Sequence, residues 1–148
     1  MTENTQKKPP LAILSQFIKD FSFEAPNSPQ LFFNKEPVEA NLKLNIDIKV
    51  KKLNEELYTV DLITKVHNTA KKDEKSIFMI ELVYSGLVGL DMPEEDKKHA
   101  LLVKVPQYLF PAVRALISRI TNESGFPPFN MALVDFEAMY KEREAKEN

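Results

Sequence analysis

Few side chains in this 148-residue sequence have a type and spacing suited to chemistry. The two histidines, His67 and His99, each lack a second histidine or a carboxylate at the spacing of a metal site. The absence of cysteine excludes thiolate catalysis and cysteine-ligated metal sites. Three glycines are too few for a phosphate-binding loop or a dinucleotide motif. We therefore predict a protein that is not an enzyme and has no cofactor or metal ion.

Two carboxylates, Asp20 and Glu24, lie four residues apart in FIKDFSFEA, where polar and apolar residues alternate. In a strand this spacing is about 13 Å, whereas the acid/base pairs of glycosidases lie about 5 to 9.5 Å apart. These carboxylates either form a solvated sheet face or dock a basic partner. Glu81, in the apolar run IFMIELV, is expected to point outward beside Met79 and Val83, because burying it unpaired is costly.

Aromatic residues in loops are the stronger signal, because ten phenylalanines and no tryptophan are present. Phe32 and Phe33 lie in a proline-rich segment, Phe126 and Phe129 in GFPPF, and Tyr108 just before an amphipathic stretch. Loops lie on the surface, so these side chains either cap the core or line a groove. A groove of Phe, Met and Leu would bind apolar segments promiscuously, which is typical of a chaperone.

Four strands are predicted to position these residues. Residues 17–25, 40–50 and 58–67 alternate with a period of two, and the first strand puts Phe17, Phe21 and Phe23 on one face and Asp20 and Glu24 on the other. Residues 76–90 are apolar on both faces, which predicts a strand covered on both sides. Short polar turns make the last three strands antiparallel neighbours, whereas proline-rich residues 26–37 suit a long crossover that could allow a parallel return.

Helices are predicted after the strands. Residues 92–105 fit a short helix, residues 109–120 a separate amphipathic helix, and Asp135 can cap a last helix that carries Phe136, Met139 and Tyr140. Strands followed by helices indicate an α+β fold with the helices packed on one face of the sheet. The length fits one domain, 1–148, with a flexible N-terminus (1–10), a folded core (11–140) and a charged C-terminal tail (141–148).

Charge and hydropathy limit the partners. Twenty basic and 22 acidic residues give a net charge of −2, so nucleic acid is not an expected partner. No run of about 18 apolar residues is present, which argues against membrane insertion, and the first ten residues do not form a signal peptide. We expect a cytoplasmic protein.

Two stretches, KDFSFEAPNSP (19–29) and LFPAVRALISRITNESGFPPFNMALVDFEAMY (109–140), resemble the SecB family of protein-export chaperones. The resemblance covers residues 11–140, and Ala132 and Leu133 depart from the family pattern within a loop. It implies a four-stranded antiparallel sheet with two helices per protomer, assembled as a homotetramer that is a dimer of dimers.

The resemblance also implies a function. Members of the family are ATP-independent chaperones that keep precursor proteins unfolded in the cytosol and deliver them to the SecA ATPase. The implied SecA-binding residues are Asp20 and Glu24, together with Met79 and Glu81. The implied client groove contains Phe32, Phe33, Tyr108, Phe126, Phe129 and Met131.

Two other functions remain possible from the residues themselves. A small-molecule-binding α+β domain would need a polar cluster in a closed pocket, and the sequence offers no clear candidate for one. A purely structural oligomer would need neither the groove nor the acidic face. The role of the charged C-terminal tail is open.

Overall fold

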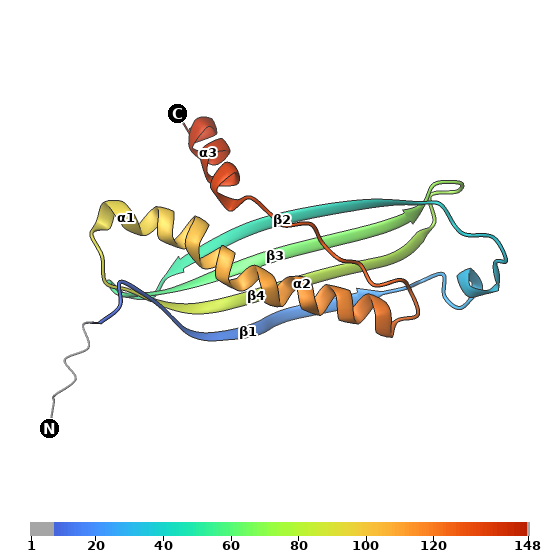
Figure 1. The fold of residues 1–148 in the computed structure, drawn as a ribbon, viewed down its shortest axis with the longest axis horizontal. Coiled ribbons are helices and arrows are strands. Elements are labelled where there is room, and N and C mark those ends of the chain that lie inside the picture. Colours follow the sequence, from blue (N-terminus) through green and yellow to red (C-terminus); the bar gives the residue numbers. More distant parts are fainter. Residues whose placement is uncertain (1–7, 148) are drawn as a thin grey trace, which may run out of the picture.

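The computed structural model describes residues 8–147 and shows one long sheet crossed by a long helix (Figure 1). The strands are β1 (Leu11–Glu24), β2 (Ala40–Lys52), β3 (Leu57–Ala70) and β4 (Ser76–Leu90). The helical elements are the 3-10 turn η1 (Gln30–Phe33), α1 (Glu94–His99), the π-helical turn η2 (Ala100–Lys104), α2 (Val105–Glu123) and α3 (Phe136–Glu147).

The sheet has the strand order β1-β4-β3-β2, and every neighbouring pair is antiparallel. The predicted four-stranded antiparallel sheet is thus confirmed. Strands β2, β3 and β4 form a meander with short polar turns, as the sequence predicts. The proline-rich crossover, residues 25–39, does not make a parallel return: it carries the chain from β1 at one edge of the sheet to β2 at the opposite edge (Figure 1).

Strand β1 is longer than predicted and contains two irregularities. Its pairing with β4 shifts between Ile13 and Ser15 and again between Ile18 and Asp20, so one residue is inserted at each point. The second bulge reverses the alternation of faces. Phe17 therefore shares a face with Asp20 and Glu24, while Phe21 and Phe23 lie on the opposite face. The predicted grouping of Phe17 with Phe21 was wrong because a strict period of two cannot reveal a bulge.

The two helices predicted at 92–105 and 109–120 form one continuous helical segment, Glu94–Glu123. A π turn joins α1 to α2, and the amide of Val105 donates to the carbonyl of Ala100, five residues earlier. Pro106 follows directly and lacks an amide proton. Proline also clashes with the carbonyl four residues before it, and the wider π turn accommodates this clash without ending the helix.

By length and composition alone, Glu94–Glu123 could cross a membrane. However, 56% of its most apolar window is buried inside the molecule. Its buried residues, among them Leu109, Val113 and Ile117, belong to the hydrophobic core.

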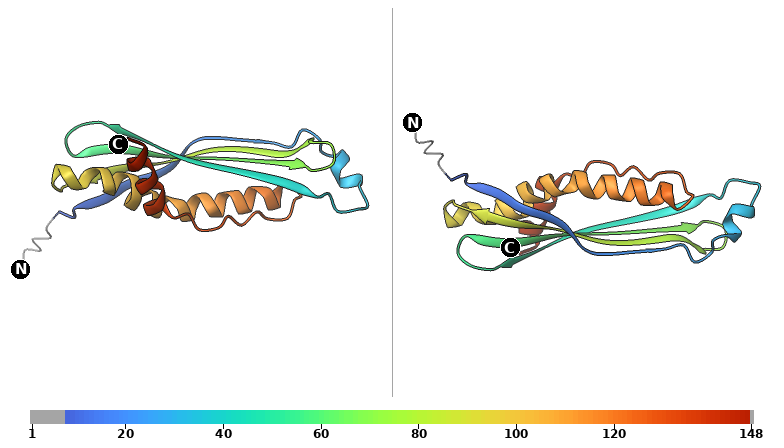
Figure 2. Two further views of the ribbon diagram at one scale, coloured as in Figure 1. Left: turned by 90° about the horizontal axis from the view of Figure 1, so that it is seen from above. Right: turned by 90° about the horizontal axis from the view of Figure 1, so that it is seen from below.

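The helices cover one face of the twisted sheet, as predicted (Figure 2). Leu109 of α2 lies so close to Gly86 of β4 that a Cβ at Gly86 would meet its side chain at 3.2 Å. Val60, Leu62, Ile80, Leu82 and Val88 from the central strands are fully buried on this face. Within residues 8–147 the opposite face has no covering layer, and Glu81 of β4 is exposed there. The prediction that β4 is covered on both sides was thus wrong. The apolar side chains on its outer face are only partly buried, by neighbouring side chains of β1 and β3.

Helix α3 begins where the sequence predicts. The carboxylate of Asp135 accepts a hydrogen bond from the amide of Ala138 at 3.0 Å, a typical N-cap. Phe136 is buried and contacts Phe110 edge to face, with ring centroids 5.8 Å apart. The helix continues to Glu147, so residues 141–147 of the predicted tail belong to it.

The predicted flexible N-terminus falls mostly on residues 1–7, which lie outside the described residues. The described part contacts the fold. Lys8 forms an ion pair with Glu56 at 2.6 Å, and the carbonyl of Pro10 accepts a hydrogen bond from the amide of Asp91 at 2.8 Å.

Candidate functional site

An open groove of about 610 Å³ lies between the crossover, the loop after α2 and the end of the sheet. We call it the aromatic groove. It is lined by Leu31, Phe32, Pro37 and Val38 from the crossover, Phe126, Pro127, Pro128 and Phe129 from the loop, and Leu42, Ile77 and Phe78 from the sheet. Proline fixes the backbone in both loops, so the aromatic residues are held in place by chain segments with little freedom.

Four phenylalanine rings connect this groove to the sheet. The ring centroids of Phe32 and Phe126 are 5.5 Å apart, those of Phe126 and Phe78 are 5.4 Å apart, and those of Phe78 and Phe23 are 6.0 Å apart. These distances are typical of favourable aromatic pairs. The crossover is also tied to β4, because Nδ2 of the Asn27 side chain donates to the carbonyl of Ser76 at 2.8 Å. The groove is thus a structured surface and not a flexible loop.

Gly125 allows the two loops to approach. Its φ is +88°, a conformation that disfavours side chains. A Cβ at this position would also meet the ring of Phe32 at 3.0 Å. Glycine is therefore required on both counts.

We expect Gly125→Ala to reduce the free energy of unfolding by about 1–2 kcal/mol, the cost of a left-handed backbone for an L-residue. The clash with Phe32 should in addition displace the crossover and weaken apolar binding in the groove. Urea unfolding measures the first effect. Gly89→Ala is the matched control, because the nearest atoms to its Cβ lie at 3.8 and 4.0 Å; equal losses in both variants would contradict the argument.

The predicted groove residues do not all lie in the groove. Phe32, Phe126 and Phe129 line it. Phe33 is 75% exposed and Tyr108 is 60% exposed, but neither contributes to its lining. Met131 is fully buried in the core. The sequence did not predict that Ile77 and Phe78 also line the groove. Both lie in the predicted strand, and the sequence of a strand does not show that its end forms the floor of a groove.

The groove contains few polar groups. Among the described residues that line it, only Asn34, Glu36 and Asn68 have polar side chains, and of these Glu36 is titratable. The side-chain oxygen of Asn68 has no hydrogen-bond partner within residues 8–147. Two convergent titratable groups, which a small-molecule or catalytic site would need, are not found in this groove. Its chemistry is suited to apolar segments of variable sequence.

A second surface lies on the uncovered face of the sheet. Across the β1–β4 pair, Asp20 is opposite Val83, Ser22 is opposite Glu81, and Glu24 is opposite Met79. Directly paired residues of antiparallel strands share a face. The four predicted SecA-binding residues are therefore contiguous on one face, and we call Asp20, Glu24, Met79 and Glu81 the acidic patch.

Basic residues limit the acidic patch on the side of β3 and β2. Lys65 is paired with Glu81 across the β3–β4 ladder, and Lys43 and Lys49 of β2 lie on the same face farther from β1. Asp61 does not add free charge, since it bonds Lys19 at 3.0 Å and Ser85 at 2.6 Å. The outer face is thus acidic along β1 and β4 and mainly basic along β2.

Neither histidine forms a metal site. Nε2 of His99 lies 2.8 Å from a carboxylate oxygen of Glu137, and its ring meets Tyr140 edge to face. This pair fixes α3 against α1, and the sequence could not show it because the partners are 38 residues apart. His67 lies on the outer sheet face, paired with Met79. Within residues 8–147 no group of three or more His, Asp or Glu could hold a metal ion.

Comparison with known proteins agrees with this geometry. The family described as "Preprotein translocase subunit SecB" matches residues 4–147. The chain belongs to the SecB family. "Protein-export protein SecB" of Granulibacter bethesdensis is 34% identical over 159 residues, covering 99% of this chain and 92% of the relative. The SecB protein of Anaplasma marginale is 38% identical over 145 residues, covering 90% of this chain and 82% of the relative.

A solved structure has the same SecB fold. It is a SecB-like chaperone of Mycobacterium tuberculosis in complex with an antitoxin peptide, with a TM-score of 0.69 and 11% identity. The superposition covers 84% of this chain and 90% of that chain. Membership of the SecB family assigns this protein a chaperone role in protein export and confirms the resemblance found in the sequence.

Proposed function

We propose that this protein is an ATP-independent holding chaperone of the cytoplasm, which binds unfolded precursor proteins and delivers them to the SecA ATPase. The aromatic groove is the observation that carries this proposal. It is open and apolar, and its rings lie on proline-rigid loops. Such a surface can bury apolar side chains of many clients, because it imposes few hydrogen-bond requirements.

The groove would select unfolded chains in a simple way. A folded protein buries most of its large apolar side chains, so it cannot present them to the groove. No energy source is needed for this discrimination, since it depends on the client's own folding state. The peptide in the complex of the distant mycobacterial relative is consistent with such binding.

Suppression of aggregation tests the proposal. A reduced, denatured precursor is diluted into buffer without nucleotide, and light scattering is followed with and without the protein. We expect scattering to be suppressed, and the same client in its folded form to show no binding by calorimetry. A requirement for ATP, or a preference for the folded client, would reject the proposal.

The acidic patch is proposed to dock SecA. Asp20, Glu24 and Glu81 project from neighbouring strands on the face opposite the helices, so bound client and docked SecA would occupy different sides of the sheet. Surface charges of this kind affect the rate and specificity of association more than the raw affinity.

A homotetramer, a dimer of dimers, is proposed for the assembly. Strand β1 is an edge strand with exposed Leu14, Phe17, Ile18 and Phe21. At the other edge, the exposed apolar residues of β2, Leu42, Leu44 and Val50, are interspersed with lysines. Charged edges resist pairing, and an apolar edge favours it. A second copy that pairs along β1 would cover these side chains.

The native mass in solution checks the assembly. We expect a value of about four times the 17.0 kDa chain, measured by light scattering behind a sizing column. We also expect Phe17→Asp, placed on the apolar edge, to lower the mass. A stable monomer of the parent chain would argue against this part of the proposal.

A further inference from the structure

The loop after α2 contributes four residues to the aromatic groove, Phe126, Pro127, Pro128 and Phe129, and we call them the groove loop. Proline has no amide proton, so only the two phenylalanines carry a backbone donor. The amide of Phe126 donates to the main-chain carbonyl of Thr121 at 3.1 Å, and the amide of Phe129 donates to Oγ1 of the Thr121 side chain at 2.9 Å. Thr121 therefore accepts both backbone amide protons of the groove loop.

Thr121 lies in the last turn of α2 and is fully buried. Its Oγ1 lies 2.8 Å from the carbonyl oxygen of Ile117 and 3.0 Å from that of Ser118. A hydroxyl has one proton to donate and two lone pairs. The proton goes to one of these carbonyls, and a lone pair accepts the amide proton of Phe129. The hydroxyl therefore connects the groove loop to a helix that packs on the sheet.

A further contact between this loop and α2 is exposed to solvent. Oγ of Ser118 donates to Oδ1 of Asn130 at 2.9 Å, one residue beyond the groove loop. Water can replace either partner there, so the loss of this bond costs little. Thr121, in contrast, is inaccessible to water, and no solvent molecule can take over its bond to Phe129 unless the loop moves. The bond to the Thr121 hydroxyl is thus the stronger constraint.

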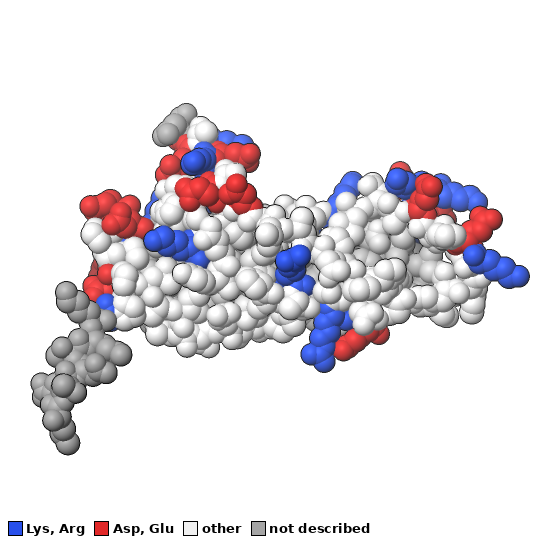
Figure 3. Space-filling view, viewed as in Figure 1, with Lys and Arg blue, Asp and Glu red and all other residues white. Residues whose placement is uncertain are grey.

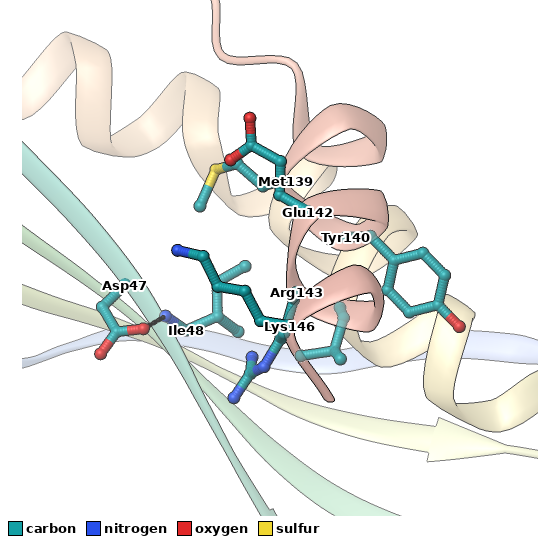
Figure 4. Close-up of a pocket in the computed structure, with 8 residues that line it drawn as sticks. Asp47, Ile48, Met139, Tyr140, Glu142, Arg143 and Lys146 are labelled. Carbon is teal, nitrogen blue, oxygen red and sulfur yellow. Dashed lines mark hydrogen bonds between the residues drawn. The ribbon is translucent and has the colours of Figure 1, made fainter. Parts of the chain in front are cut away.

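Charge does not hold the groove loop in place. Residues 124–134 have no charged side chain, and the surface over α2 is largely uncharged (Figure 3). Helix α3 differs, since Glu147 pairs with Lys98 of α1 at 3.0 Å. The cavity of about 280 Å³ between α3 and β2 is lined by charged side chains, which Figure 4 shows for Asp47, Glu142, Arg143 and Lys146. Salt therefore screens the contacts of α3 but not those of the groove loop.

The groove loop has little conformational freedom besides these bonds. Proline fixes φ at positions 127 and 128. Phe126 and Pro127 each precede a proline, and such residues avoid the helical range of ψ. With both ends bonded to Thr121, the loop holds its two rings in the groove lining without a bound client. Binding to such a preorganised surface costs less conformational entropy than binding to a mobile one.

We propose that Thr121 is a positioning residue of the aromatic groove, whose buried hydroxyl holds Phe129 in the orientation that a client segment meets. Thr121 does not touch the client, because it is fully buried; it acts through Phe129. This inference rests on the proposed function, because it takes an unfolded, apolar segment as the ligand of the groove.

The variant Thr121→Val removes the hydroxyl and keeps the shape of the side chain. The main-chain carbonyl still accepts the amide of Phe126, but the amide of Phe129 loses its partner. The loop then also populates conformations in which the Phe129 ring is displaced, and the apparent affinity falls with the populated fraction of the competent conformation. We expect the Kd for an apolar peptide to rise roughly three- to tenfold. Thr121→Ser keeps the hydroxyl and is expected to bind within about twofold of the parent.

The probe is a ten-residue peptide that alternates leucine and serine. Its Kd is obtained by methyl NMR titration of isoleucine-labelled protein from the resonance of Ile77, which lines the aromatic groove. The loss in Thr121→Val should be the same at about 20 mM and about 0.5 M salt, because no charge takes part. The matched control is Ser124→Ala, which removes a hydroxyl bond of 2.7 Å to the carbonyl of Ile120 near the same helix end. Ser124 does not line the groove, so the Kd of this control should equal that of the parent.

A double variant separates positioning from a general loss of stability. In a Phe129→Ala background the ring that Thr121 positions is gone, so adding Thr121→Val should change the Kd by less than about twofold. A merely structural role predicts that the two losses multiply, and that result would overturn the inference. Parent-like binding by Thr121→Val, an equal loss in Ser124→Ala, or a lower native mass in Thr121→Val alone would overturn it as well.

Hydrogen exchange tests the inference without any substitution. We expect the amide of Phe129 to be protected from exchange in the free parent protein, and peptide binding to add little protection. Protection that arises only with bound peptide would show that the groove loop is ordered by the client, which contradicts preorganisation.

Failure of this inference can be told apart from failure of the proposed function. A parent protein that suppresses aggregation while Thr121→Val binds the peptide equally well rejects the positioning role only. A parent protein that does not suppress aggregation rejects the chaperone proposal itself.

Discussion

Phe32→Ser is expected to weaken the binding of an unfolded precursor roughly 3- to 10-fold, the equivalent of about 0.7–1.5 kcal/mol for burying the exposed half of a phenylalanine side chain. Phe32 lines the aromatic groove, and its ring contacts that of Phe126 at a tilt of 33°. Because the ring is 49% exposed before any client binds, the folded state should lose little stability. The affinity is measured by titration of a fluorescent, reduced precursor.

Phe33→Ser is the matched control for this variant. Phe33 is the adjacent residue of the same loop and is 75% exposed, but it does not line the groove. We expect its affinity for the precursor to stay within about twofold of the parent, since losses below 0.5 kcal/mol are typical of exposed sites. If both variants lose affinity equally, the groove is not the site, and general surface hydrophobicity explains binding.

Reversing the charge of the acidic patch with Asp20→Lys, Glu24→Lys is expected to weaken SecA binding at least about tenfold at low salt. Both carboxylates lie on the face opposite the helices, so the aromatic groove and the fold should be unaffected. The difference should shrink as salt rises, because a Debye length of about 10 Å at 0.1 M screens exposed charges. Surface plasmon resonance at several salt concentrations measures this.

The matched control is Glu95→Lys, Glu142→Lys, which changes the net charge by the same amount on α1 and α3. We expect it to bind SecA like the parent. A native mass that falls only in the Asp20/Glu24 variant would mean that the effect arises from assembly. Unchanged SecA affinity in that variant would remove the acidic patch from the proposal.

Most of the sheet could be predicted from the sequence. In β2, Ile46, Ile48 and Val50 alternate with Asp47 and Lys49, and the structure keeps this pattern with the apolar side chains toward the helices. Such alternation can be read from the local sequence, because apolar side chains gain free energy on transfer from water to the core face and polar side chains do not. The apolar run of β4 likewise predicts the bounds Ser76 and Leu90 correctly.

The bulge in β1 and the π turn before Pro106 could not be predicted in the same way. Both depend on what the element must pack against: β1 inserts Lys19 against β4, and the helix passes Pro106 without a break because Leu101, Leu102 and Val103 are buried against the sheet. The tertiary contacts override the local preferences there.

The candidate site shows the same division. The proline-rich loops with Phe32 and Phe126 allowed two predictions, a cap on the core or a groove, because loops lie on the surface; the resemblance to the family implied the groove. Nothing in the sequence distinguished Phe32 from Phe33, or showed that Met131 is buried. Those differences depend on which side of η1 faces Gly125 and on how the loop after α2 turns inward.

The crossover from one sheet edge to the other has a consequence for the order of folding. Strands β2, β3 and β4 are joined by short turns and can pair early. Strand β1 can pair only after β4 has formed, and paired residues such as Phe23 of β1 and Ile80 of β4 are far apart in the sequence. Pairings with a large sequence separation close long loops and form slowly. We expect β1 to join the meander last and to bring the crossover with Phe32 into place. The aromatic groove and the apolar β1 edge would then be created in the same late step, so a partly folded chain would expose neither in its finished form.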